Sequence, residues 1–134
     1  MPVNDLTRKF SKELNSGTTA LALLGILIQF KKPMYGYELG IQLAGVTDDG
    51  LPMNHGALYP VLRSLERSGL LISEMEPSST GPPRRYYKPT ALGKSQFAEW
   101  IAVWNRTRNW LDGVLEQKHE QRDNKRTQHP TRRS

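Results

Sequence analysis

The stretch that decides the fold is residues 54–90, which read NHGALYPVLRSLERSGLLISEMEPSSTGPPRRYYKPT. Its first part carries leucines at helical spacing, Leu58, Leu62 and Leu65, which predict one buried stripe with Val61 beside it. Asn54 suits the start of this helix, because its side-chain oxygen can accept from a free backbone N–H of the first turn. The stretch therefore begins as a short amphipathic helix.

The predicted helix ends at Gly69, a residue type that readily adopts the positive φ of a C′ position. Pro60 lies inside it, where the ring removes a hydrogen bond and crowds the carbonyl four residues back. That residue is Gly56, which has no side chain to crowd the displaced carbonyl, so we expect a tolerated bend. The leucine stripe leaves another face, which carries three residues spaced four apart: His55, Tyr59 and Arg63.

Two strands follow the helix. Residues 70–76 and 84–88 have strand character, and a loop of seven residues rich in Pro, Gly and Ser separates them. They predict a β-hairpin. A short helix, a stop and a hairpin are together typical of the DNA-reading half of a winged helix.

Composition bounds the class of protein. A chain of 134 residues is long enough for one domain with a real core. The formal charge of +6 favours a nucleic-acid partner only slightly, because residues 116–134, with six basic and three acidic side chains, supply half of the excess. A basic end of a chain is usually only solvated.

Several classes of site are not indicated. The chain has no cysteine and its three histidines are scattered, which argues against a structural zinc site and a disulfide framework. It has no glycine-rich phosphate loop, nucleophile motif or paired carboxylates, so we predict no enzyme activity and no metal or other cofactor. No apolar run approaches the ~20 residues that span a bilayer, and no signal peptide is evident. We expect a cytoplasmic protein without a membrane partner.

The residues before position 54 predict two or three helical segments. Residues 1–16, with Leu6, Phe10 and Leu14 four apart, predict a loose amphipathic helix or a partly ordered arm. Residues 18–30 are strongly apolar and predict a buried helix, and residues 34–44 predict a second helix.

The last predicted helix covers residues 90–117 and begins with Thr90 as its N-cap. At 100° per residue, its large apolar side chains occupy an arc of about 100°, which three further residues widen to about half the helix. The narrower arc comprises Phe97, Trp100, Ile101, Trp104, Leu111 and Leu115, and the flank comprises Val103, Trp110 and Val114. Because this apolar surface is larger than a small domain can cover, we expect the helix to pair with the same helix of a second chain.

The predicted architecture is therefore mainly α with a small β-hairpin. Residues 1–16 form a flexible arm or loose helix, residues 17–89 a winged helix-turn-helix, residues 90–117 a dimerisation helix and residues 118–134 a disordered basic tail.

Three segments in this order resemble the PadR family of transcriptional regulators, over residues 18–115. They are YGYEL at 35–39, GALYPVLRSLE at 56–66 with GL at 69–70, and RRYY at 84–87 with Thr90 and Gly93 after it. Asn54 stands where the family pattern often has Ser, which keeps the cap. Pro89 replaces a Leu before Thr90, which should alter only the approach to the last helix.

The resemblance implies a homodimeric winged helix-turn-helix that binds an inverted repeat and usually represses. The short form, with one C-terminal helix, is similar to members whose paired tryptophans line a drug-binding pore at the dimer interface. The operator, the ligand and even the existence of an effector differ between members and do not carry over.

Two groups of candidate site residues follow. The predicted DNA contacts are Tyr35, Asn54, His55, Gly56, Tyr59, Arg63, Arg84, Arg85 and Tyr87. The predicted dimer surface, which could also hold a small aromatic or cationic effector, comprises Phe97, Trp100, Ile101, Trp104 and Leu111.

Each group also has a structural interpretation. An exposed Tyr and Arg are most often a solvated helix face, arginines can simply protect strand edges, and the tyrosines can serve in part as packing residues. An aromatic stripe is more often core or dimer interface than a ligand site. The alternative function is a winged-helix protein-interaction module that does not read DNA.

Overall fold

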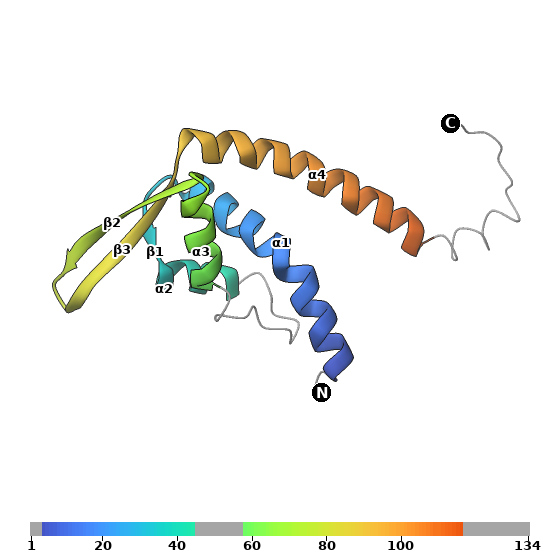
Figure 1. Ribbon diagram of the computed structural model, residues 1–134, viewed down its shortest axis with the longest axis horizontal. Helices are drawn as coiled ribbons and strands as arrows, with labels where there is room; N and C mark the ends of the chain where they lie inside the picture. The colour runs from blue at the N-terminus through green and yellow to red at the C-terminus, as the bar shows by residue number, and fades with distance from the viewer. Residues whose placement is uncertain (1–3, 45–57, 117–134) are drawn as a thin grey trace, which may run out of the picture. The chain divides into compact units, whose positions relative to one another are not determined.

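The computed structural model describes residues 4–44 and 58–116. Its elements are α1 (Asp5–Phe30), β1 (Met34–Tyr35), α2 (Gly36–Ala44), α3 (Leu58–Arg67), β2 (Leu71–Ser78), β3 (Gly81–Pro89) and α4 (Ala91–Leu115). Figure 1 shows these helices and the antiparallel sheet of the described residues, whose strand order is β1-β3-β2. The predicted fold class, mainly α with a small β-hairpin, is confirmed. The chain divides into two compact units, Met1–Glu99 and Trp100–Ser134.

Helix α1 is one continuous helix of 26 residues. Its N-cap is Asn4, whose side-chain oxygen accepts a 2.8 Å hydrogen bond from the backbone N–H of Thr7. Residues 5–16, predicted as a loose amphipathic helix or a partly ordered arm, are helical and continue without a break into the apolar segment predicted at residues 18–30. Gly17, at the expected break, costs a helix interior only about 1 kcal/mol relative to Ala and does not end it by itself. The helix ends at Lys31, which adopts the left-handed conformation with φ 58°.

The predicted helix over residues 34–44 is correct only from Gly36 onward. Met34 and Tyr35 instead form β1 and pair with Tyr87 and Tyr86 of β3. This pairing joins residues about fifty positions apart, so no local pattern in residues 34–44 could show it. Glu38 accepts a 3.1 Å hydrogen bond from the backbone N–H of Tyr35 and so ties β1 to the first turn of α2.

Helix α3 packs its leucine stripe into the core as predicted. Leu58, Leu62 and Leu65 are all buried, and Gly69 has the expected positive φ, at 82°. The predicted cap at Asn54 and the bend opposite Gly56 lie outside the described residues. The other buried apolar side chains of the described residues are Leu23, Leu24, Leu27, Met34, Leu39, Leu43, Leu70, Leu71 and Tyr87.

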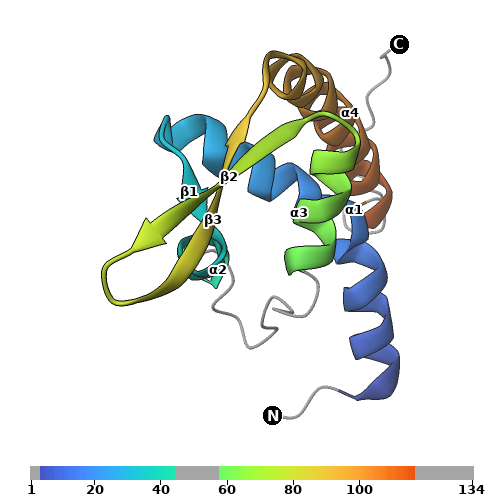
Figure 2. The same cartoon turned by 60° about the vertical axis from the view of Figure 1, so that its left-hand side comes forward.

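The hairpin is longer than predicted. Its strands reach the turn at residues 79–80, and the ladder has an irregularity between Glu76 and Ser78. Pro77, Pro82 and Pro83 all fall in the gap between the two flanking residue pairs, where no ladder hydrogen bond requires their missing N–H. The supposed seven-residue loop is therefore mostly strand, and Figure 2 shows the resulting two-stranded ribbon.

Helix α4 begins against the end of α3. The Thr90 hydroxyl accepts a 2.9 Å hydrogen bond from the N–H of Gly93 and donates a 2.6 Å bond to the carbonyl of Gly69. The Thr90 N–H donates to the carbonyl of Leu70 over 3.1 Å. The predicted N-cap is confirmed, and the same side chain fastens the start of α4 to the turn that follows α3.

Candidate nucleic-acid interface

The face of α3 opposite its buried leucines is exposed. Tyr59 is 46% exposed and Arg63 is also exposed, one helical turn further on. These are two of the predicted DNA contacts, and the structure brings them together on one side of the helix. Three others, Asn54, His55 and Gly56, lie outside the described residues.

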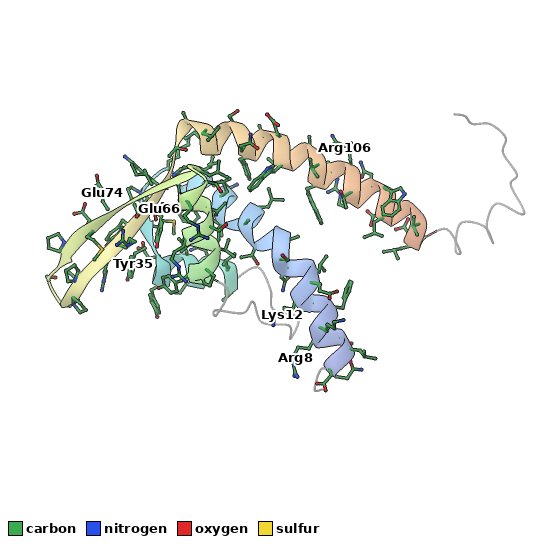
Figure 3. All side chains as sticks on the ribbon, viewed as in Figure 1. Arg8, Lys12, Tyr35, Glu66, Glu74 and Arg106 are labelled. Carbon is green, nitrogen blue, oxygen red and sulfur yellow. The ribbon has the colours of Figure 1, made fainter. Side chains whose placement is uncertain are left out.

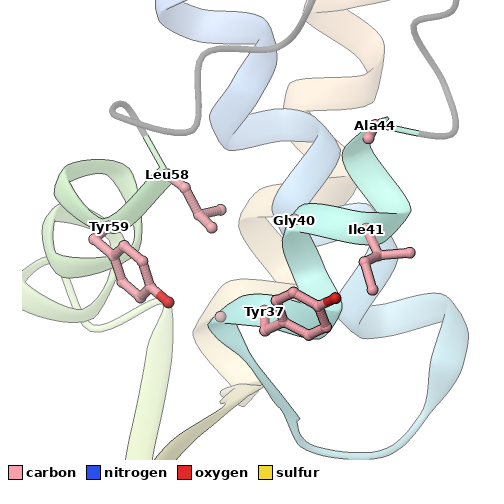
Figure 4. A pocket seen from close by; sticks show the side chains of 7 residues that line it. Tyr37, Gly40, Ile41, Ala44, Leu58 and Tyr59 are labelled. Carbon is pink, nitrogen blue, oxygen red and sulfur yellow. The ribbon is translucent and has the colours of Figure 1, made fainter.

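Tyr59 is positioned by a glycine of α2. The space that a Cβ would need at Gly36 is filled by the Tyr59 ring and its hydroxyl oxygen, so only glycine allows this approach. Beside this contact, one side of α2 along its whole length and the first turn of α3 border an apolar hollow of about 270 Å³ (Figure 4). Its lining residues are Gly36, Tyr37, Gly40, Ile41, Ala44, Leu58 and Tyr59. The Tyr59 ring is thus fixed on one side by α2 while part of it stays accessible.

The two arginines of the hairpin lie on opposite faces of the sheet. Successive side chains of a strand alternate between faces, so Arg84 and Tyr86 share one face of β3 while Arg85 and Tyr87 share the other. The Tyr87 face turns toward the core, because Tyr87 is buried. The two arginines, predicted as a pair with one role, therefore have different surroundings.

Arg84 belongs to an aromatic cluster. Its guanidinium carbon lies 4.4 Å from the centre of the Tyr35 ring, which is a cation–π geometry. The Tyr35 ring lies 5.3 Å from that of Tyr86 and 6.3 Å from that of Tyr37, centre to centre. Figure 3 labels Tyr35 beside the hairpin. Tyr35, predicted as a DNA contact, is half-buried in this cluster and supports Arg84.

Arg85 belongs to a hydrogen-bonded chain of three side chains. Its Nη1 donates to the Ser73 hydroxyl over 3.0 Å, and that hydroxyl donates to Oε2 of Glu66 over 2.6 Å. The chain connects β3, β2 and α3. Arg85 itself remains exposed.

Tyr87 does not fit its predicted role as a DNA contact. It is only 3% exposed, and it lies on the core-facing side of the sheet between Met34 of β1 and Ser73 of β2, with which it pairs. Burial raises the pKa of the Tyr87 phenol above its ordinary value of 10.0; the positive charge of Arg85 opposes this rise and the negative charge of Glu66 adds to it. Tyr87 is a core residue at the base of the hairpin.

The predicted dimer residues do not all share one environment. Phe97 is half-buried, and a methyl group at Gly25 of α1 would lie 3.1 Å from its ring, so Phe97 packs within its own chain. Beyond Glu99, Trp104 is 39% exposed and Trp110 is 67% exposed. The other exposed large apolar side chains of this part of α4 are Ile101, Val103, Leu111, Val114 and Leu115.

Within residues 4–44 and 58–116, no group of three or more His, Cys, Asp or Glu side chains could hold a metal ion. None of the described helices combines the length and hydropathy needed to cross a membrane.

Sequence reasoning missed several residues that build this surface. Gly36 and Gly93 matter because of close approaches, to Tyr59 and to the carbonyl of Leu70. Ser73 and Glu66 matter because of a contact between elements. Two signals for the glycines were available: both lie inside predicted helices, where glycine is otherwise unfavourable, and both belong to the segments that resemble the PadR family.

Solved structures and one further relative resemble this chain. A PadR family transcriptional regulator from Eggerthella lenta DSM 2243 is 35% identical with a TM-score of 0.65, over 84% of this chain and 94% of that one. A PadR-like transcriptional regulator from Bacillus cereus strain ATCC 14579 is 27% identical with a TM-score of 0.64, over 78% and 97%. An uncharacterized protein from Lysinibacillus sphaericus is 28% identical over 86 residues, which are 64% of this chain and 79% of that protein.

The family match covers the elements described above. Residues 23–99, more than half of the chain, match the transcriptional regulator PadR-like family. They span the buried half of α1, the exposed face of α3, the hairpin and the start of α4. The predicted resemblance is confirmed, as is the prediction of a DNA-binding regulator and not an enzyme. This chain, whose winged helix exposes a Tyr and an Arg on α3 and carries two arginines on its hairpin, therefore belongs to the PadR-like family of transcriptional regulators.

Proposed function

We propose that this regulator is a cytoplasmic homodimer that represses transcription by binding an inverted-repeat operator. Helix α3, here termed the reading helix, enters the major groove, and the hairpin of β2 and β3, here termed the wing, contacts the backbone or minor groove beside it. We propose a repressor because the resemblance to the PadR family implies one, and a dimer bound over a promoter would keep RNA polymerase from the same DNA.

The DNA-contacting role of the reading helix is supported by its division into a buried face and an exposed face. Three leucines hold one face in the core, while Tyr59 and Arg63 stand on the exposed face. Arg63 can donate bidentate hydrogen bonds to a base edge or to a phosphate, and Tyr59 can donate to a phosphate from its fixed position against Gly36. We expect Tyr59→Ala or Arg63→Ala to weaken operator binding by about 1–3 kcal/mol.

The dimer is supported by the apolar side chains of α4. Seven large apolar residues between Ile101 and Leu115 are exposed in the single chain. Burying each is worth roughly 1.5–3 kcal/mol, so a second copy of the same helix would gain much by covering them. Pairing through a two-fold axis also spaces two reading helices for two half-sites.

A ligand class follows from the same helices. Trp104 is 39% exposed, and the faces of aromatic rings attract flat rings and cations. We propose that the paired helices admit a small aromatic or cationic effector near Trp104. Quenching of tryptophan fluorescence during titration with a planar cationic dye tests this, with Trp104→Ala as the control.

Selection of bound fragments from random duplex DNA tests the regulator as a whole. The expected result is a pseudo-palindromic consensus whose affinity falls steeply with salt, because each neutralised phosphate contributes about −0.9 to the logarithmic slope. Absence of a consensus, with salt-independent binding to a protein partner through α4, would favour the protein-interaction module instead.

A further inference from the structure

Ser73 lies where the reading helix meets the wing. Its hydroxyl donates to Glu66 of α3 over 2.6 Å and accepts from Arg85 of β3 over 3.0 Å. A hydroxyl has one proton to donate and lone pairs with which to accept, so this arrangement uses it in both directions. Since both partners are charged, both bonds belong to the stronger, charge-assisted kind.

Strand register explains why these three side chains meet. Ser73 pairs with Tyr87 and Met75 pairs with Arg85, so Ser73 and Arg85 are diagonal neighbours on the core-facing side of the sheet. Glu66 reaches the same point from the last turns of α3, across the turn at Gly69. Figure 3 labels Glu66 on α3 beside the base of the wing.

The Arg85 side chain keeps most of its binding capacity in this arrangement. A guanidinium has five N–H donors in a planar fork, and within residues 4–44 and 58–116 the bond to Ser73 engages one of them. Ser73 stands between Arg85 and the Glu66 carboxylate, which therefore does not take the fork in a direct bidentate pair. The guanidinium is oriented but still exposed.

We propose that Glu66, acting through Ser73, is a positioning residue that holds Arg85 of the wing ready for a phosphate of the DNA backbone. The inference rests on the proposed function, since it assigns a support to one of the proposed contacts. It separates Arg85 from Arg84, whose guanidinium is supported by the Tyr35 ring on the other face of the sheet.

The physical effect is preorganisation. An arginine side chain loses rotamer freedom when it binds, and a hydrogen bond that already restricts the free side chain reduces that loss. Because the other end of the chain of bonds is Glu66, the reading helix and the wing also keep a fixed relation while they approach the duplex.

A double-mutant cycle tests the proposal. Ser73→Ala removes the bridging hydroxyl without changing any charge, and Ser73→Thr retains it. Ser95→Ala makes the same chemical change at an exposed position of α4 and serves as the matched control. Affinity for the selected operator is measured for each variant and for Arg85→Ala, alone and combined with Ser73→Ala, together with circular dichroism and the thermal midpoint.

We expect Ser73→Ala to weaken binding by about three- to tenfold, the range of an ordinary hydrogen bond, because the variant loses the support of the Arg85 contact and keeps the contact itself. Ser73→Thr and Ser95→Ala should bind like the parent. In the Arg85→Ala background, Ser73→Ala should have no further effect, a coupling that a general loss of fold stability would not produce.

Two results overturn the proposal. One is parent-like affinity of Ser73→Ala, and the other is an equal loss from Ser73→Ala with and without Arg85. If the parent chain itself bound no duplex across the salt series, the proposed function would fail, and this inference with it. If the parent bound the operator and Ser73→Ala did not change the affinity, the inference alone would be overturned.

Discussion

Helices α3 and α4 carry the same kind of sequence pattern but meet different surroundings. In α3 the leucines at helical spacing are all buried by the chain itself. In α4 beyond Glu99 the apolar side chains at similar spacing are exposed, from Ile101 to Leu115. An apolar stripe therefore shows that a helix will pack but does not show against what, and we infer that the stripe of α4 packs against a second chain.

The largest difference should appear between Leu62→Ala and Leu111→Ala. Leu62 is fully buried, so its truncation should lower the free energy of unfolding by about 2–5 kcal/mol, whatever the protein concentration. Leu111 is exposed in the single chain, so its truncation should matter only where chains associate. Urea unfolding at two protein concentrations, followed by circular dichroism, measures both. Equal, concentration-independent losses would show that the two helices do not differ in this way.

The next effect concerns the dimer. Trp104→Ala should loosen association by about 2–4 kcal/mol, the range of a central aromatic residue in an interface, and should weaken operator binding because a monomer reads one half-site. Light scattering at micromolar concentration gives the mass. A parent chain that has the mass of one monomer yet binds the operator fully would remove both the dimer and the effector site near Trp104.

Two glycines of α4 should respond to alanine with opposite signs. A Cβ at Gly93 would collide with the backbone carbonyl of Leu70, which cannot move aside, so Gly93→Ala should destabilise the fold by about 1–3 kcal/mol. Nothing lies within 4 Å of a Cβ at Gly113, so Gly113→Ala should stabilise the helix by up to about 1 kcal/mol. Thermal unfolding compares the two. A stabilising Gly93→Ala would contradict the close contact at the start of α4.

The smallest effect is the contribution of Tyr87 to the pH dependence of the free energy of unfolding. Burial raises the pKa of Tyr87 in the folded protein above its ordinary value, so from about pH 10 the unfolded chain loses this proton first. The stability that the Tyr87 proton contributes is fully present below that pH, and it is lost as the pH rises through the pKa of Tyr87 in the folded protein. Unfolding free energies between pH 8 and 11 should therefore fall less steeply for Tyr87→Phe than for the parent. Parallel curves would mean that the phenol is not desolvated.

The sequence by itself determined the features that depend on neighbours a few residues apart. The buried face of α3, the positive φ of Gly69 and the cap at Thr90 were all predicted and confirmed. Helical periodicity, left-handed conformation and capping are local properties, so the residues that cause them lie within about one turn of each other.

Only the tertiary structure decided which distant residues meet. Pairing with β3 made Met34 and Tyr35 a strand, buried Tyr87 and decided which of the two arginines, Arg84 or Arg85, shares the core-facing side of the sheet. Register in a sheet is fixed by the pleat and by packing across the whole domain, and a shift of one residue exchanges the two faces. For the same reason the bridge from Glu66 to Arg85 could not be predicted from the sequence, because it requires α3, β2 and β3 to be in place together.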